Sequence, residues 1–169
     1  MHEPCGSANA RFVLTLAEIL PERCVSTSLD ATSKSEVLRQ LATLYTHSDL
    51  TVDPETISEV LEERERLAST GVGSGVAIPH GRLTDIPGVR LVLGTHRAGV
   101  DFDAVDGRPV HIFVGVLAPD GQASQHLKVL ARVSRLLRDP QLRERLLQAS
   151  SPSEAYRCLI EMDERLSMG

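Results

Sequence analysis

Histidine 80 is the residue of this 169-residue chain whose setting best suits chemistry near neutral pH, since imidazole both titrates and attacks there. The chain has six histidines and only five Phe and Tyr residues, with no Trp. His80 lies between Pro79 and Gly81, a pattern that predicts a ring presented on a loop. An unreactive surface histidine is the ordinary alternative, so neighbouring residues must decide between the two.

Two residues distant in sequence are candidates to act with His80. Arg64 continues the apolar stripe of residues 57–61, so it faces inward at the C-terminal end of a predicted helix. Its guanidinium would bind phosphoryl oxygens bidentately, or it would extend along the core edge into water. His126 lies on the inward stripe of a later helix, in the first turn, where free N–H groups attract anions. A core-edge histidine with one hydrogen bond is an equally good interpretation of His126.

Residues 69–75 are rich in glycine, which raises the alternative of a nucleotide site. The GxGxxG pattern would need a glycine at Val76, and the chain contains no GK followed by Ser or Thr. The segment therefore predicts an irregular, flexible connection that another backbone can approach closely.

The other polar clusters favour structural interpretations. His96 and His111 fall in expected strands, where an imidazole is commonly buried and hydrogen-bonded. A zinc site built from His80, His126 and one strand histidine is an alternative without HxxxH or HExxH spacing to support it. The acidic run that contains Glu65 predicts a solvated helix face.

Helix starts are clearly marked by residues that cap helices or begin their first turn. Ser33 with Glu36 is a capping box that predicts a helix of about 13 residues. A further helix carries Leu127, Leu130 and Leu137 at helical spacing. Proline at the first helical position marks three more starts, at Asp53–Pro54, Asp139–Pro140 and Ser151–Pro152.

Residues rich in β-branched side chains occupy the middle of the chain. Strands are expected at residues 76–78, 89–97, 100–103 and 110–117, with Asp106–Gly107 as a hairpin turn between the last two. Helices at both ends and strands between them predict an α/β (α+β layered) fold, a central mixed sheet of about five strands flanked by helices on both sides. We expect one domain over residues 14–165, after a flexible leader at residues 1–13.

Composition excludes several classes of protein. A net charge of −5 and a pI near 5.7 argue against a nucleic-acid partner. The apolar stretch of residues 110–118 is about half the roughly 20 residues that a membrane span needs. Three widely spaced cysteines without a CxxC motif, and no secretory signal, predict a reducing, cytoplasmic setting.

Residues 64–81 read RERLASTGVGSGVAIPHG, and they resemble the active-site signature of the IIA domains of the bacterial phosphoenolpyruvate-dependent phosphotransferase system, fructose/mannitol type. The resemblance continues through residues 102–110 (FDAVDGRPV), 117–119 (LAP) and 126–127 (HL), and covers roughly residues 14–163. Residues 14–20 and the length are most similar to the nitrogen-regulatory branch of that family.

The resemblance implies that His80 accepts a phosphoryl group on Nε2 from an HPr-like phosphocarrier, the nitrogen-branch carrier NPr, and that regulatory target proteins read the outcome. Arg64 and His126 match the residues expected to hold the phosphoryl oxygens, without a cofactor or metal. Attack through Nε2 requires some acceptor for the Nδ1 proton, which the sequence leaves open.

Two alternatives stay beside the regulatory relay. One is a sugar-uptake IIA component of a fructose/mannitol-type permease. The other is a non-catalytic interaction domain whose histidine cleft binds an anion or a metal.

Arg66 and Ser74 stand where lysine and asparagine are common in the family, but neither position touches the expected chemistry.

Overall fold

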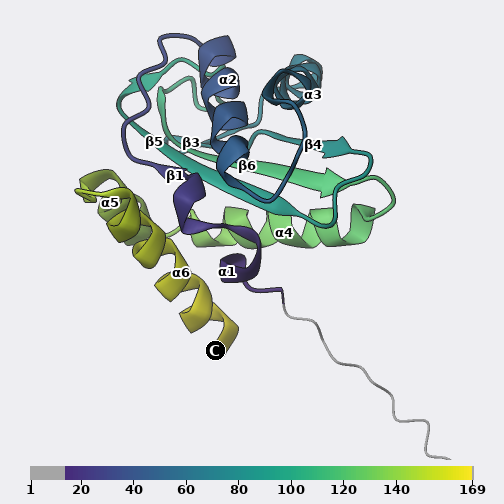
Figure 1. The fold of residues 1–169 in the computed structure, drawn as a ribbon. Coiled ribbons are helices and arrows are strands. Elements are labelled where there is room, and N and C mark those ends of the chain that lie inside the picture. Colours follow the sequence, from purple (N-terminus) through teal and green to yellow (C-terminus); the bar gives the residue numbers. More distant parts are fainter. Residues whose placement is uncertain (1–13, 169) are drawn as a thin grey trace, which may run out of the picture.

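A computed structural model describes residues 14–168, and the leader expected at residues 1–13 lies outside these described residues (Figure 1). Within them, six strands form one mixed sheet, one more than the approximate number expected. The strand order is β1 (Val25–Ser26), β5 (Arg90–Val100), β6 (Val110–Pro119), β3 (Val76–Ala77) and β2 (Gly71–Gly73), and β4 (His80–Leu83) also pairs with β6.

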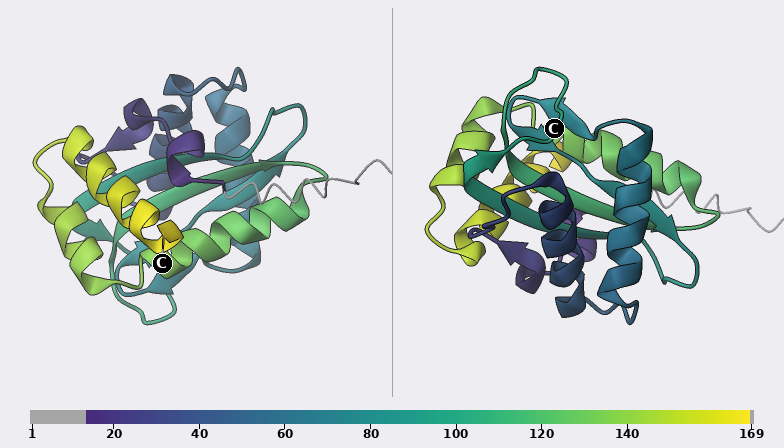
Figure 2. Two further views of the ribbon diagram at one scale, coloured as in Figure 1. Left: turned by 90° about the horizontal axis from the view of Figure 1, so that it is seen from below. Right: turned by 90° about the horizontal axis from the view of Figure 1, so that it is seen from above.

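Helices cover both faces of the sheet, as expected. One face carries α2 (Lys34–Leu44) and α3 (Pro54–Leu67), and the other carries α1 (Leu16–Ile19), α4 (Ala123–Leu136), α5 (Pro140–Gln148) and α6 (Pro152–Met168) (Figures 1 and 2). Short 3₁₀ turns lie at Glu22–Cys24 and Tyr45–His47. None of the helices within residues 14–168 is long and apolar enough to cross a membrane.

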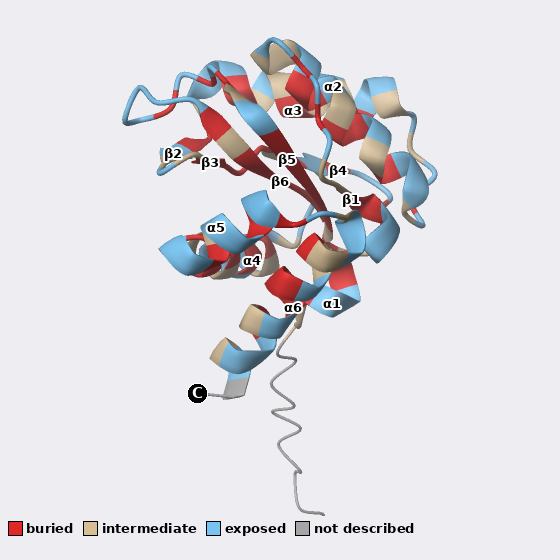
Figure 3. Ribbon diagram, turned by 90° about the vertical axis from the view of Figure 1, so that its left-hand side faces the viewer, coloured by how far each residue is buried: buried red, intermediate tan, exposed pale blue. Residues whose placement is uncertain are grey.

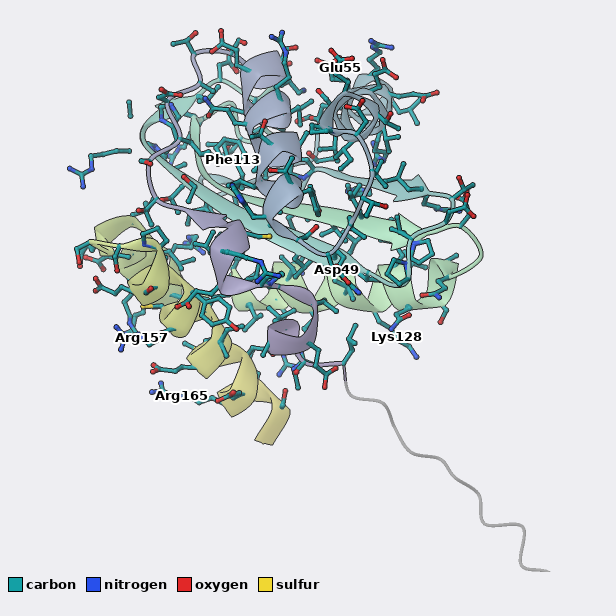
Figure 4. All side chains as sticks on the ribbon, in the orientation of Figure 1. Asp49, Glu55, Phe113, Lys128, Arg157 and Arg165 are labelled. Carbon is teal, nitrogen blue, oxygen red and sulfur yellow. The ribbon has the colours of Figure 1, made fainter. Side chains whose placement is uncertain are left out.

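Strand β6 lies at the centre of the architecture. It runs antiparallel to β5, with Leu93 opposite Val114, and parallel to both β3 and β4. Nine of its ten residues are buried, because helices cover the sheet above and below it (Figure 3). Figure 4 places Phe113 of this strand inside the protein, whereas Glu55 and Lys128 lie at the surface.

The strands predicted at residues 89–97 and 100–103 are wrong as separate elements. The first is part of strand β5, which continues to Val100 through an irregularity in register after Thr95, whereas residues 101–103 lie outside any strand. The Nδ1 atom of His96 accepts a hydrogen bond from the Gly99 N–H (2.9 Å), so a side chain replaces a ladder bond there. The strand ends where Asp101 accepts the Asp103 N–H (3.1 Å), and the Asp106–Gly107 turn lies within the longer connection of residues 101–109.

The glycine-rich segment is more regular than predicted. It forms the hairpin of β2 and β3, and its turn has positive φ at Gly73 (95°), Ser74 (57°) and Gly75 (78°). Glycine adopts these angles at little cost, so the same residues that suggested irregular backbone allow a tight turn. The carboxylate of Asp106 accepts the Ser74 N–H (3.0 Å) and attaches this turn to the 101–109 connection.

The predicted helix starts are confirmed by their caps. Helix α2 has eleven residues, close to the expected length, and the 3₁₀ turn extends it. Side-chain oxygens accept first-turn N–H groups in four helices, at Ser33 (from Glu36, 3.2 Å), Asp53 (from Glu55, 2.9 Å), Asp139 (from Gln141, 2.8 Å) and Ser151 (from Glu154, 3.2 Å).

The inward face of α4 differs from the predicted stripe at one end. Leu127 is 67% exposed, while His126, Val129 and Val133 are buried. The imidazole of His126 takes the inward position in the first turn, which directs the next residue to solvent. The sequence correctly placed His126 on the buried stripe and wrongly included Leu127.

A buried carboxylate joins the layer of helices that contains α4. Asp163 of α6 is 1% exposed, and it accepts hydrogen bonds from the Leu16 N–H (2.9 Å) and from the Arg132 guanidinium of α4. A buried charge of this kind is tolerated only while its cation and hydrogen-bond donors are present. Asp163 thus links α1, α4 and α6.

Replacing Arg132 with methionine should lower the free energy of unfolding by about 3 kcal/mol, because the Asp163 carboxylate would stay buried without its cation. Urea unfolding followed by circular dichroism measures the change. Arg135→Met, on the exposed side of the same helix, is the matched control and should change stability little. Equal losses for the two variants would contradict a stabilising role for the buried pair.

Candidate functional site

His80 lies on a strand and not on the predicted loop. It is the first residue of β4, where it stands opposite Val116 of β6. Pro79 has no N–H, but its carbonyl accepts the Val116 N–H (2.9 Å), so the chain passes from β3 to β4 alongside one partner strand. Pairing across the sheet thus overrides the turn tendency of the Pro-His-Gly sequence, and it leaves the His80 ring half-buried at the edge of the sheet.

The acceptor that orients His80 is the carbonyl of Ile78, 2.8 Å from Nδ1. A carbonyl only accepts, so Nδ1 carries the proton and Nε2 of the neutral ring has a free lone pair. Burial lowers the pKa of His80, the Ile78 carbonyl opposes that effect, and the charge of Arg64 lowers the pKa further. The ring is therefore neutral and nucleophilic at Nε2 near pH 7.

His126 faces His80 from the N-terminal turn of α4. The two ring centroids are 5.5 Å apart and the rings meet edge to face, with an interplanar angle of 75°. His126 is 6% exposed, and among residues 14–168 its Nε2 atom has no hydrogen-bond partner. Burial, followed by the neighbouring His80 and Arg82, lowers the pKa of His126 to about 4. A buried ring nitrogen with no partner is costly, and it is suited to a ligand that would bond to it.

Arg64 approaches the same place from α3. Gly81 lets this helix pack directly on β4, since a Cβ atom there would overlap Cγ1 of Val60. Arg64 follows Val60 by one helical turn, and its Nη1 donates to the Ala68 carbonyl (3.1 Å) beyond the end of the helix. Its positive charge acts on the pKa of His80. The structure thus places His126 in ring contact with His80, and it places Arg64 of a third element near enough for its charge to lower the pKa of His80.

Two further charged residues belong to this region, although the sequence did not suggest them. Arg82 lies two residues after His80, hence on the same face of β4, and its charge helps to lower the pKa of His126. Strand periodicity would have found Arg82 if His80 had been placed on a strand. Glu65 was predicted to be solvated and is 6% exposed, because it continues the buried i, i+4 series of Ile57 and Leu61.

The strand histidines form a separate, structural cluster, in agreement with expectation. His96 donates from Nε2 to the Ala31 carbonyl (2.7 Å), and His111 donates from Nδ1 to the His96 carbonyl (3.0 Å). Neither ring is near enough to complete a metal site with His80 and His126, and residues 14–168 contain no group of three or more potential His, Cys, Asp or Glu ligands.

The geometry suits a tetrahedral oxyanion held on His80. Its Nε2 atom has a lone pair, the unpaired Nε2 of His126 is a second polar group in the site, and the guanidinium of Arg64 supplies positive charge. Phosphoryl transfer needs little more than such positioning and charge stabilisation.

Known proteins of one family are similar to this chain in sequence and in fold. The family model described as "Phosphoenolpyruvate-dependent sugar phosphotransferase system, EIIA 2" matches residues 18–162. The nitrogen regulatory protein of Bradyrhizobium diazoefficiens is 34% identical over 147 residues, which are 86% of this chain and 95% of that protein. The crystal structure of the nitrogen regulatory protein IIA-Ntr from Neisseria meningitidis aligns with a TM-score of 0.78 and 32% identity, covering 84% of this chain and 97% of that one.

A longer relative is the fructose-specific EIIABC component of Bacillus subtilis, which is 29% identical over 138 residues. These residues are 82% of this chain but 22% of that relative. The chain therefore spans about a fifth of the length of this relative.

The depressed pKa of His126 predicts a pH-dependent stability. Between the ordinary histidine value of 6.5 and about 4, the unfolded chain binds a proton at this residue that the folded protein excludes. The free energy of unfolding should therefore be at its full value above pH 6.5 and fall as the pH drops through this range. Urea unfolding at several pH values measures the fall.

His126→Phe should reduce this pH dependence to the part that the lowered pKa of His80 contributes, because one titrating group is gone and a ring still fills the site. His47→Ala removes an exposed histidine and should leave the wild-type profile in place. An unchanged profile in His126→Phe would show that other groups cause the fall.

Proposed function

The chain belongs to the phosphoenolpyruvate-dependent sugar phosphotransferase system EIIA 2 family, and from this premise we propose that it is a phosphohistidine-relay regulator of the nitrogen branch. The domain that carries this function spans residues 14–165. The observation that carries the proposal is the geometry of His80: its Nε2 has a free lone pair, and its ring meets edge to face the buried ring of His126, whose Nε2 has no partner among the described residues. The nitrogen regulatory relatives, which this chain spans almost fully, support the regulatory branch.

The proposed reaction transfers a phosphoryl group between two imidazoles. The Nε2 lone pair of His80 attacks the phosphorus of a phosphohistidine on the donor, and the electron pair of the breaking N–P bond returns to the donor nitrogen. The Nδ1 proton of His80 stays on its ring, hydrogen-bonded to the Ile78 carbonyl, so no proton has to move during transfer. The step needs an in-line approach and stabilisation of the equatorial oxygens.

Arg64 and His126 would stabilise those oxygens. The guanidinium must exchange its bond with the Ala68 carbonyl for one with the phosphoryl group, a change within reach of a long side chain at a helix end. The phosphoryl dianion raises the pKa of a neighbouring imidazole, so His126 becomes a better donor once His80 is phosphorylated. Arg82, on the His80 face of β4, adds positive charge to the same region.

The phosphoryl donor would be an HPr-like carrier, NPr in the nitrogen branch, which it would meet in the cytoplasm. Large apolar side chains that are exposed in the described chain and close in sequence to the site residues would contribute to docking. Leu67 follows Arg64 on α3, Leu127 follows His126 on α4, and the Val105 N–H bonds to Gly71 next to Val72. Regulatory target proteins would distinguish the two phosphorylation states by the negative charge and the acceptor oxygens of the phosphoryl group.

A sugar-uptake role is the second candidate, and the fructose-specific relative favours it. The same phosphorylated histidine would then pass its phosphoryl group to a permease component. Restoration of sugar uptake in a strain that lacks a fructose/mannitol-type IIA component would support this role. Specific capture of a non-transport target by only one of wild type and His80→Ala would support regulation.

The central test is phosphoryl uptake from labelled phosphoenolpyruvate in the presence of the general or nitrogen-branch enzyme and carrier. Wild type should gain acid-labile, base-stable label, and His80→Ala should gain none. His126→Ala should still be labelled at a rate about a hundredfold lower, comparable to the loss of one oxyanion-hole donor. The exposed His47→Ala is the matched control and should retain the wild-type rate.

Label on His80→Ala would contradict the assignment of the acceptor. Wild-type rates in His126→Ala would remove that residue from the site. A chain that takes up no label but binds inorganic phosphate or zinc stoichiometrically in calorimetry would instead be the non-catalytic interaction domain.

A further inference from the structure

We propose that Glu65 is a positioning residue: with Lys34 and Thr70 it forms a buried chain of hydrogen bonds that holds the Ile78 carbonyl against Nδ1 of His80 and so selects the reactive tautomer. The inference deepens the proposed function and rests on it for its effect on phosphoryl transfer. Its structural part, the control of the His80 tautomer, can be measured without any transfer.

Glu65 is a buried carboxylate whose two oxygens are both used. Oε1 lies 2.8 Å from Nζ of Lys34 and accepts the Thr70 N–H (2.9 Å), and Oε2 accepts the Thr70 hydroxyl (2.6 Å). A carboxylate out of water is expensive to retain unless such partners compensate it. The side chain of Glu65 therefore holds the start of the β2–β3 hairpin in one position relative to the end of α3.

Lys34 also contacts two residues of the connection at residues 101–109, Asp103 and Phe102. Its ammonium lies 3.6 Å from the Asp103 carboxylate and 4.9 Å from the centre of the Phe102 ring. The hydroxyl of Ser69 donates to the Phe102 carbonyl (2.7 Å), which joins the same connection to the residue before Thr70. The cation opposite Glu65 thus has a defined place among α2, α3 and residues 101–109.

Hydrogen bonds through the backbone of Ile78 connect Thr70 to the ring of His80. The Thr70 carbonyl accepts the Ile78 N–H (3.0 Å), and the Ile78 carbonyl accepts the His80 Nδ1–H (2.8 Å). On the other side, strand β6 anchors the residues next to Ile78, through the pairing of Ala77 with Phe113 and through the Pro79 carbonyl, which accepts the Val116 N–H. Loss of Glu65 would leave that second anchor in place, so the Ile78 carbonyl would become less well placed without the strand separating from the sheet.

The tautomer is the quantity that distinguishes positioning from general stability. If the Ile78 carbonyl moves away, Nδ1 loses its acceptor and the neutral ring is free to carry its proton on Nε2, where it blocks attack. Most destabilising substitutions far from the site would unfold the protein without changing which nitrogen is protonated in the folded fraction. A tautomer change in a folded variant is therefore specific to the network.

The test uses the full chain labelled with ¹⁵N, with the ring-nitrogen chemical shifts of His80 recorded at about pH 8, where histidine is neutral. Wild type should show protonated Nδ1 and unprotonated Nε2. Glu65→Ala should show a mixture of the two tautomers and about tenfold slower phosphoryl uptake, mainly in kcat, similar to losses of outer partners of functional histidines. Glu63→Ala, exposed on the same helix, is the matched control and should leave both measurements unchanged.

Thr70 provides a milder pair of variants if Glu65→Ala does not fold. Thr70→Val removes the hydroxyl that donates to Glu65 and keeps the shape, and Thr70→Ser restores the hydroxyl. The valine variant should shift the tautomer toward Nε2–H, and the serine variant should return it toward wild type.

Wild-type tautomers in the folded Glu65→Ala or Thr70→Val protein would overturn the inference, whatever the uptake rate. The proposed function fails separately, if the wild-type protein takes up no phosphoryl group. A tautomer shift in the variants would then still establish the positioning network.

Discussion

The candidate site depends on the backbone of β6, because this one strand aligns two separate parallel segments. Strand β3 pairs with Ile112 and Phe113, and β4 begins further along, opposite Val116. The two residues between β3 and β4 must cross this interval, and the crossing directs the Ile78 carbonyl to a side chain instead of a ladder partner. The Nδ1 acceptor of His80 is thus a backbone carbonyl that strand pairing places, and the Glu65 side chain would support the same carbonyl through Thr70.

Burial keeps both imidazoles of the His80–His126 pair uncharged near pH 7. Both imidazoles have lowered pKa values, chiefly because burial penalises their charged forms, so neither ring is a cation near pH 7. The arginine at the end of α3 supplies positive charge without depending on pH. A dianion arriving at His80 would change this balance by raising the pKa of the adjacent His126 imidazole.

Much of the architecture follows from local signals in the sequence. Capping residues such as Ser33 and Asp53 predicted where helices begin, since a cap needs only its own first turn. The nomination of His80, Arg64 and His126 relied on helix periodicity, on the Pro-His-Gly setting and on the family resemblance. The strand position of His80 and the burial of Glu65 were missed, because both depend on partners distant in sequence, Val116 for one and Lys34 for the other. The acceptor of Nδ1 was missed for the same reason, since a backbone carbonyl has no signature in the residue type.

The lengths of the outer strands have a consequence for how the protein meets other molecules. Among the described residues, β1 has two residues, β2 three and β4 four, and β4 carries the exposed Arg82. Short edges with a charged side chain make poor templates for an added strand from another chain. Main-chain pairing of another chain with these three short strands is therefore disfavoured, which favours recognition of this molecule through side chains and helix ends.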